Sequence, residues 1–86
     1  MGSWKKTLRK LLLGASDANM DFEAMCSMLR HVGFQQRTKG SHFIYSMEGV
    51  EEILNLQSKN GKGKPYQMKQ VRDMLVKYKL AEQGNE

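Results

Sequence analysis

One stretch decides the fold: Phe34-Gln35-Gln36-Arg37-Thr38-Lys39-Gly40-Ser41-His42-Phe43-Ile44-Tyr45. Aromatic and β-branched residues lie on both sides of Lys39-Gly40, and glycine accepts the positive φ angles of a tight turn. The pattern therefore predicts two antiparallel strands joined by a two-residue turn at Lys39-Gly40. The cross-strand pairs expected in this register are Thr38–Ser41, Arg37–His42, Gln36–Phe43 and Phe34–Tyr45.

The predicted hairpin gathers groups that interact with phosphate. An imidazole (His42), a guanidinium (Arg37) and an ammonium (Lys39) are expected close together, next to the hydroxyl of Ser41. Histidine transfers protons near neutral pH, and the two cations can neutralise a phosphate. A single histidine in a strand is more often structural or merely exposed, and this alternative stands beside the catalytic one.

A third strand is predicted over residues 50–57, after a second turn at Glu48-Gly49. With a two-residue turn, His42 pairs with Asn55, so that Arg37, His42 and Asn55 form one row across a sheet face. A three-residue turn would reverse the parity of the third strand and remove Asn55 from this row. The opposite face is more apolar and is expected to lie against the helices. Its side chains are Phe34, Phe43, Tyr45, Leu54 and Leu56.

Three helices are predicted from apolar side chains at helical spacing. The first covers residues 4–14 and is basic; it could lie on a membrane or bind a partner, but packing on the domain is expected. The second begins after Asp21, a good N-cap, and ends at Gly33, with His31 in a capping or surface role. The third begins near Pro65 and ends near Leu80. The expected buried stripes are Trp4, Leu8, Leu11 and Leu12; Phe22, Met25, Leu29 and Val32; and Met68, Val71, Leu75 and Tyr78.

Basic residues concentrate in the last third of the chain. Residues 58–65 read as a flexible basic loop that leads into the third helix. Lys62 and Lys64 precede the helix N-terminus, whose free N–H groups and dipole also attract phosphate. Four residues are therefore candidates for contact with RNA: Lys62, Lys64, Lys69 and Arg72. The alternative is a solvated loop and helix face.

Composition limits the function classes. The chain has 86 residues, enough for one domain, and a net charge of +5, which favours an acidic partner such as nucleic acid. Its one cysteine excludes an internal disulfide, and with only two histidines no metal or other cofactor is expected. No apolar run or signal-peptide core suggests a membrane or export, so a cytoplasmic location is expected. Residues 81–86 read as a polar tail.

The hairpin motif resembles that of a known family. The order Gly33-Phe34, then Lys39-Gly40-Ser41-His42, is similar to the Gly-Phe … Lys-Gly-Ser-His signature of the HicA toxins, and the resemblance covers residues 20–80. One departure is Phe43, where many members carry a second histidine or a polar residue. The resemblance implies an mRNA-cleaving toxin, neutralised by a HicB-like antitoxin. It implies that His42 is the catalytic histidine, with Gly40 and Ser41 matching the positions before it.

The fold class expected is α+β. Helix, three-stranded antiparallel sheet and helix follow one another in residues 20–80, an order that resembles the double-stranded RNA-binding domain, here with an extra N-terminal helix. In the enzymatic interpretation, His42 activates a ribose 2′-hydroxyl without a metal, while Arg37 and Lys39 neutralise the phosphorane. Two alternatives remain open. One is a non-catalytic RNA-binding module that uses the basic residues of the third helix, and the other is a domain whose basic face binds an acidic protein.

Overall fold

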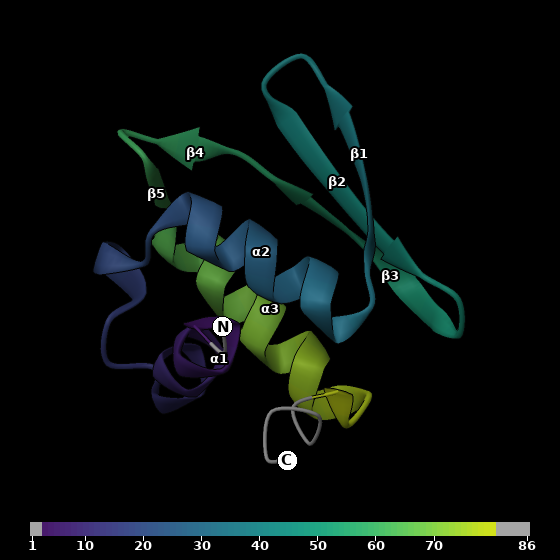
Figure 1. The fold of residues 1–86 in the computed structure, drawn as a ribbon, viewed down its shortest axis with the longest axis horizontal. Coiled ribbons are helices and arrows are strands. Elements are labelled where there is room, and N and C mark those ends of the chain that lie inside the picture. Colours follow the sequence, from purple (N-terminus) through teal and green to yellow (C-terminus); the bar gives the residue numbers. More distant parts are fainter. Residues whose placement is uncertain (1–2, 81–86) are drawn as a thin grey trace.

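Three helices and a three-stranded antiparallel sheet form the α+β architecture of the chain, seen in a computed structural model that describes residues 3–80 (Figure 1). The predicted tail over residues 81–86 lies outside the described residues. The main elements are α1 (Ser3–Leu13), α2 (Phe22–Val32), β1 (Gln35–Lys39), β2 (His42–Met47), β3 (Val50–Leu56) and α3 (Pro65–Lys77). A 3₁₀ turn, η1 (Asp17–Asn19), and a small hairpin, β4 (Ser58–Lys59) and β5 (Lys62–Gly63), complete them.

The first hairpin turns one residue later than its sequence predicts. Lys39 pairs with His42, so the turn residues are Gly40 and Ser41 rather than Lys39 and Gly40. Gly40 has a φ of +60°, whereas Ser41 keeps a negative φ, which is the pattern of a type II′ turn with glycine first. The predicted turn would have placed a lysine at the position of positive φ, and this steric cost explains the difference. The observed pairs are Gln35–Ser46, Gln36–Tyr45, Arg37–Ile44, Thr38–Phe43 and Lys39–His42.

The second hairpin turns at Glu48-Gly49, as predicted, with Met47 opposite Val50. The pairing of β2 with β3 then becomes irregular between Tyr45 and Met47, because β3 advances four residues while β2 advances two. The predicted pairs are therefore wrong by two residues. The observed ones are Tyr45–Leu54, Ile44–Asn55 and Phe43–Leu56. A two-residue shift preserves parity, so Asn55 stays on the same face of the sheet as His42.

The predicted limits of α2 are confirmed. The backbone N–H of Ala24 donates to Asp21 Oδ2 at 2.9 Å, which makes Asp21 the N-cap. Gly33 closes the helix with a φ of +125°, and its N–H donates to the carbonyls of Leu29 and Arg30. A side chain would be strained at this φ, which is why glycine follows the helix here.

Residues 58–65 are not the flexible loop that their composition predicts. Asn60 and Gly61 both have positive φ, 55° and 79°, and form a type I′ turn between β4 and β5. The backbone N–H of Phe22 donates to the Gly61 carbonyl, and that of Gly63 donates to the Met20 carbonyl, both at 3.0 Å. The small hairpin is therefore attached to the start of α2. The dipeptide Asn60-Gly61 was the signal for it in the sequence.

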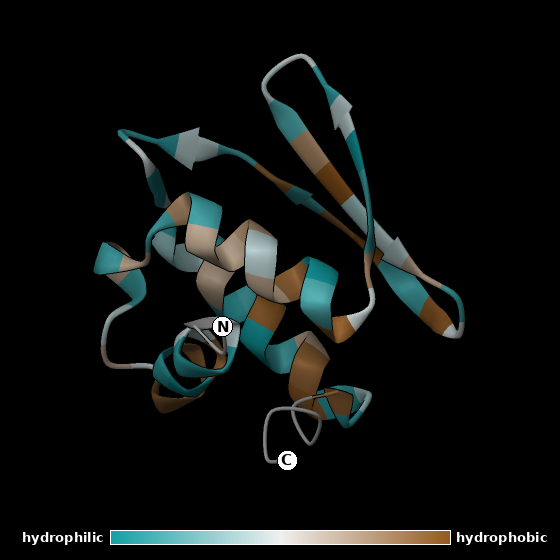
Figure 2. Cartoon of the chain, viewed as in Figure 1, coloured by the Kyte–Doolittle hydropathy of each residue, from teal (hydrophilic) through white to brown (hydrophobic). Residues whose placement is uncertain are grey.

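The hydrophobic core lies between the helices and one face of the sheet (Figures 1 and 2). Leu8 and Leu11 are buried, so α1 packs on the rest of the chain as expected. The sheet contributes three buried side chains to this core, those of Tyr45, Leu54 and Leu56. Phe43 is only partly buried. The predicted stripes of α2 and α3 are confirmed, with Tyr78 only partly buried. Within residues 3–80 no helix is both long and apolar enough to cross a membrane.

Candidate functional site

His42 begins β2, directly after the turn, and its side chain is exposed. The parity of β2 places it on the sheet face opposite to the buried Tyr45. The imidazole Nδ1 lies 2.8 Å from Oδ1 of Asn55, which belongs to β3. A shallow concavity of about 500 Å³ surrounds the ring. It is lined by Lys39, Gly40, His42, Ile44 and Asn55.

The cation directly across from His42 is Lys39, not Arg37 as predicted. The turn at Gly40-Ser41 moves Arg37 opposite Ile44, two residues along the edge strand. Arg37 remains on the same face, since alternate residues of a strand share a face. Arg37 and Lys39 are both exposed, as are all the other residues of β1. Figure 1 shows why: the β1–β2 hairpin extends away from the helices.

Ser41 connects the turn to the start of α3 through Gln57. The amide Nε2 of Gln57 donates to Ser41 Oγ at 3.0 Å, and Lys64 Nζ donates to Gln57 Oε1 at 3.3 Å. The buried side chain of Gln67 accepts a hydrogen bond from the backbone N–H of Gln57, with 3.4 Å between that nitrogen and Oε1. Sequence patterns do not predict this connection, since a glutamine after a strand is an ordinary solvated residue.

Three of the four predicted RNA-contacting residues lie near the start of α3. Lys62 is exposed and donates to Asn19 Oδ1 at 3.3 Å, and Lys64 is the residue before Pro65, the first residue of the helix. Lys69 is exposed one turn later. Because Lys64 also reaches Gln57, the basic end of α3 and the Gly40-Ser41 turn belong to one continuous polar surface.

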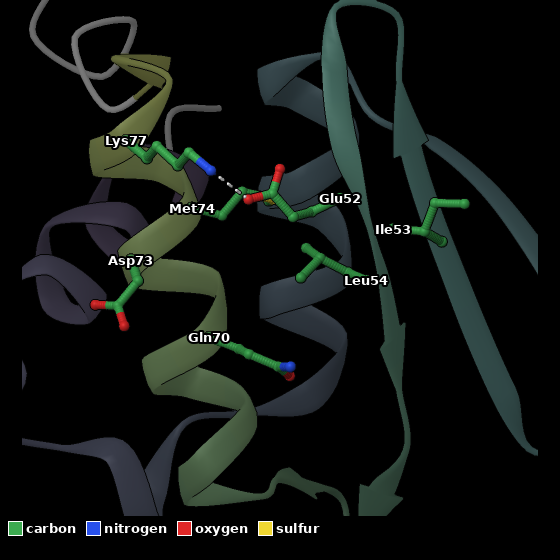
Figure 3. A pocket seen from close by; sticks show the side chains of 7 residues that line it. All are labelled: Glu52, Ile53, Leu54, Gln70, Asp73, Met74 and Lys77. Atoms are coloured by element: carbon green, nitrogen blue, oxygen red, sulfur yellow. Dashed lines mark hydrogen bonds and ion pairs between the residues drawn. The ribbon is translucent and has the colours of Figure 1, made fainter.

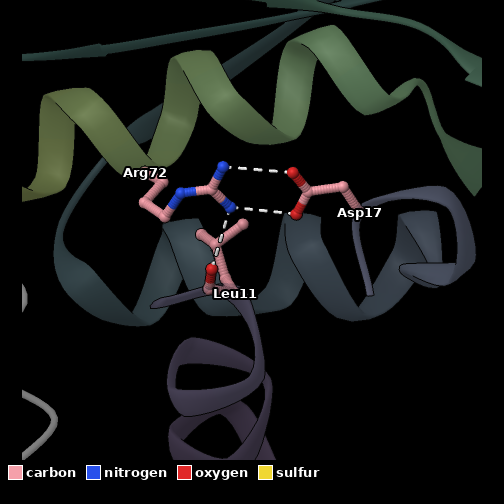
Figure 4. A network of polar contacts seen from close by, with 3 residues as sticks. All are labelled: Leu11, Asp17 and Arg72. Atoms are coloured by element: carbon pink, nitrogen blue, oxygen red, sulfur yellow. Dashed lines mark hydrogen bonds and ion pairs between the residues drawn. The ribbon is translucent and has the colours of Figure 1, made fainter. Parts of the chain in front are cut away.

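Arg72, the fourth, is half-buried and bound to other residues of the chain (Figure 4). Its guanidinium donates to both carboxylate oxygens of Asp17, at 2.9 and 3.1 Å, and to the Leu11 carbonyl at 3.1 Å. The hydrogen bonds to Asp17 raise the pKa of Arg72 above its ordinary value. A guanidinium with its donors used in this way joins α1, η1 and α3, and its contact with RNA stays a prediction.

Arg72→Ala is expected to destabilise the fold by about 1–3 kcal/mol, because it leaves partly buried acceptors on Asp17 and Leu11 without a donor. Urea unfolding of the variant measures this loss. The control is Lys69→Ala, which removes the same charge from an exposed position of the same helix and should stay within about 0.5 kcal/mol of the wild type. Loss of RNA affinity by Arg72→Ala without a loss of stability would show that Arg72 contacts RNA and does not hold the fold together.

A second polar cluster holds the edge strand against α2. Gln36 Oε1 accepts from Tyr45 Oη at 3.0 Å and from Arg30 Nη1 at 2.6 Å. Burial raises the pKa of Tyr45, so its hydroxyl remains a proton donor at neutral pH. Burial likewise raises the pKa of the neighbouring Cys26 thiol, which disfavours its thiolate form. The cluster anchors β1 at Gln36, three residues before the Lys39 that precedes the turn.

A groove between β3 and α3 is a further concave surface beside the sheet, and Figure 3 shows its side chains. Lys77 Nζ lies 2.9 Å from a carboxylate oxygen of Glu52, and the Tyr78 hydroxyl donates to the other oxygen. The hydrogen bonds from Tyr78 and Lys77 lower the pKa of Glu52. With its carboxylate satisfied by these two groups, Glu52 joins β3 to the end of α3.

In the part of the chain that the structure describes, no three His, Cys, Asp or Glu side chains lie close enough together to hold a metal ion. Comparison of the chain with protein-family models, with curated proteins and with solved structures gives no significant match.

Proposed function

We propose that the chain is an endoribonuclease that cleaves mRNA at the hairpin formed by β1 and β2, and that it is the toxin of a HicA-like toxin–antitoxin pair. The observation that carries the proposal is the placement of Gly40-Ser41-His42. The motif forms the turn and the first residue of β2, with an exposed imidazole directly across from Lys39. Transesterification of RNA uses a proton acceptor for the 2′-hydroxyl and positive charge for the phosphorane, and both lie here beside an open concavity.

The proposed reaction needs no group beyond RNA and the protein. His42 accepts the proton of a ribose 2′-hydroxyl, and the 2′-oxygen forms a bond to the adjacent phosphorus. The bond from phosphorus to the 5′-oxygen breaks, and that oxygen takes a proton from water or from the Lys39 ammonium. Lys39 and Arg37 stabilise the extra negative charge of the phosphorane. The products are a 2′,3′-cyclic phosphate and a 5′-hydroxyl, and solvent returns the enzyme to its starting protonation.

The order α2, β1, β2, β3, α3 supports a fold like that of the double-stranded RNA-binding domain, with α1 and the β4–β5 hairpin as additions. In that fold a basic helix N-terminus contacts phosphates. Lys62 and Lys64 stand at the corresponding end of α3, and Lys69 follows on the same helix. We propose that these three residues hold the RNA backbone while the Gly40-Ser41 turn reaches the scissile phosphate.

The proposed partners are mRNA and a HicB-like antitoxin, which places the protein in the cytoplasm. The net charge of +5 supports an acidic partner in either case. The exposed hairpin with Arg37, Lys39 and His42 is the surface that an inhibitor would have to cover.

Incubation of the purified protein with RNA in excess EDTA, followed by gel electrophoresis, tests the proposal. Cleavage is the expected result. A salt-sensitive mobility shift without cleavage would instead select the non-catalytic RNA-binding module. Neither cleavage nor a shift, together with binding of an acidic protein, would select the protein-binding domain.

The double variant Lys62→Ala/Lys64→Ala is expected to weaken RNA binding for all sequences alike. Removal of each phosphate-binding cation should flatten the plot of log affinity against log salt by roughly 0.7 to 0.9 units of slope. The positions of the cleavage sites should not change, because binding to phosphate carries no base information. The matched control is Lys6→Ala/Lys10→Ala on α1, which lowers the net charge equally. An unchanged salt slope in the first variant, or an equal change in both, would show that the α3 start does not contact RNA.

A further inference from the structure

Among the residues that line the concavity around His42, Asn55 has a side chain that can accept a hydrogen bond from the ring. Among the other lining residues, the Lys39 ammonium only donates, Ile44 is apolar and Gly40 has no side chain. Oδ1 of Asn55 lies 2.8 Å from Nδ1 of His42. Since a carbonyl oxygen only accepts, this contact requires the proton of the neutral ring to be on Nδ1.

The position of Asn55 is fixed by its strand. Its neighbours Leu54 and Leu56 are 4% and 0% exposed, and its backbone pairs with Ile44 of β2. The side chain itself is exposed, on the face without helices. Asparagine is depleted in strands, and a residue that departs from local preference at an exposed position points to a role for its side chain.

We propose that Asn55 is a positioning residue that holds His42 in the Nδ1–H tautomer and so keeps Nε2 unprotonated, as the atom that accepts the 2′-hydroxyl proton. The role rests on the proposed endoribonuclease function. No residue between 3 and 80 forms a hydrogen bond with Nε2, so its lone pair is available to a substrate. When Nε2 takes the proton, Nδ1 keeps its own, and the bond to Asn55 persists through the reaction.

Nitrogen-15 NMR of the imidazole rings tests the tautomer without RNA. At alkaline pH, His42 of the wild type should show the Nδ1–H pattern. Asn55→Ala should give a mixture of tautomers, whereas Asn55→Asp, which keeps an acceptor oxygen, should retain the pattern. His31 is an internal reference, because its Nδ1 lies 2.8 Å from the Ser27 carbonyl and should be Nδ1–H in every variant. An Nε2–H signal for His42 in the wild type, or an unchanged tautomer in Asn55→Ala, would overturn the proposal.

RNA cleavage provides the second readout. Asn55→Ala should lower the rate about tenfold, the effect of losing one orienting hydrogen bond, while Asn55→Asp stays within about threefold of the wild type. The melting temperature should not change in either variant. Cleavage by Asn55→Ala at the wild-type rate would overturn the positioning role while leaving the nuclease function intact. A wild type that shows the expected tautomer but cuts no RNA would overturn the nuclease function, and the catalytic use of this bond with it.

Discussion

His42→Ala is expected to lower RNA cleavage by about 10²–10⁴-fold, the usual contribution of a positioned general acid or base. The fold should be nearly unaffected, because the His42 side chain is exposed and its one hydrogen bond is to the exposed Asn55. Surface substitutions of this kind usually change the free energy of unfolding by no more than about 0.5 kcal/mol. RNA affinity should also change little, since the proposed role of His42 is proton transfer and the RNA backbone is held by Lys62, Lys64 and Lys69. Single-turnover cleavage rates and urea unfolding, measured on the same preparations, separate these effects.

The chain offers a matched control in His31→Ala, the same substitution at its other histidine. His31 stacks on Trp4, with ring centroids 5.5 Å apart, at the junction of α1 and α2. Its removal should leave the cleavage rate within about threefold of the wild type, because a substitution away from the site touches no reacting group. A His42→Ala protein that cuts RNA at the original rate, or that loses several kcal/mol of stability, would show that His42 is structural.

Tyr45→Ala is expected to cost about 3–5 kcal/mol of stability, as is typical for removal of a large aromatic side chain from a core. Tyr45 is fully buried, and its hydroxyl holds Gln36 of the edge strand. The total stability of a small domain is about 5–15 kcal/mol, so a large part of it would be lost. Cleavage should fall with the folded fraction, and thermal unfolding measures that fraction directly.

Two further variants separate the contributions of Tyr45. Tyr45→Phe keeps the packing and removes only the hydroxyl, so it should cost about 0.5–1.5 kcal/mol. Phe43→Ala, two residues earlier, should cost less than Tyr45→Ala, because Phe43 is partly buried and packs edge-on against Phe22, with ring centroids 5.1 Å apart. If Tyr45→Ala unfolds no more easily than Phe43→Ala, the sheet is not anchored through Tyr45.

Local chemistry was sufficient to predict the main elements. Four predicted features each depend on a few adjacent residues, and all four are observed. They are the helix cap at Asp21, the helix end at Gly33, the turn at Glu48-Gly49 and the helix start at Pro65. The burial of one sheet face and of the helix stripes follows from periodicity alone. The turn of the first hairpin was predicted one residue too early, because the glycine was assigned to the second turn position instead of the first.

Contacts between distant residues account for what the sequence could not show. Arg72 appears as one more cation of a basic helix, and only the fold brings it to Asp17, 55 positions earlier. The link from Ser41 through Gln57 to Lys64 likewise depends on where β3 ends relative to the turn. The sequence predicted the His42–Asn55 contact because it placed the two residues directly opposite each other. The contact is present, but Asn55 lies opposite Ile44 instead. The contact forms between residues offset along the two strands, after an irregularity that no turn signal marks.

Cleavage of a defined oligoribonucleotide in EDTA, compared with the same oligonucleotide carrying one 2′-deoxy sugar at the cleavage site, tests the central claim most directly. The account predicts that the all-ribose substrate is cut to a 2′,3′-cyclic phosphate and a 5′-hydroxyl, and that the single missing 2′-hydroxyl abolishes cutting there because it is the nucleophile. Cleavage of the 2′-deoxy substrate, or the appearance of 5′-phosphate ends, would contradict it.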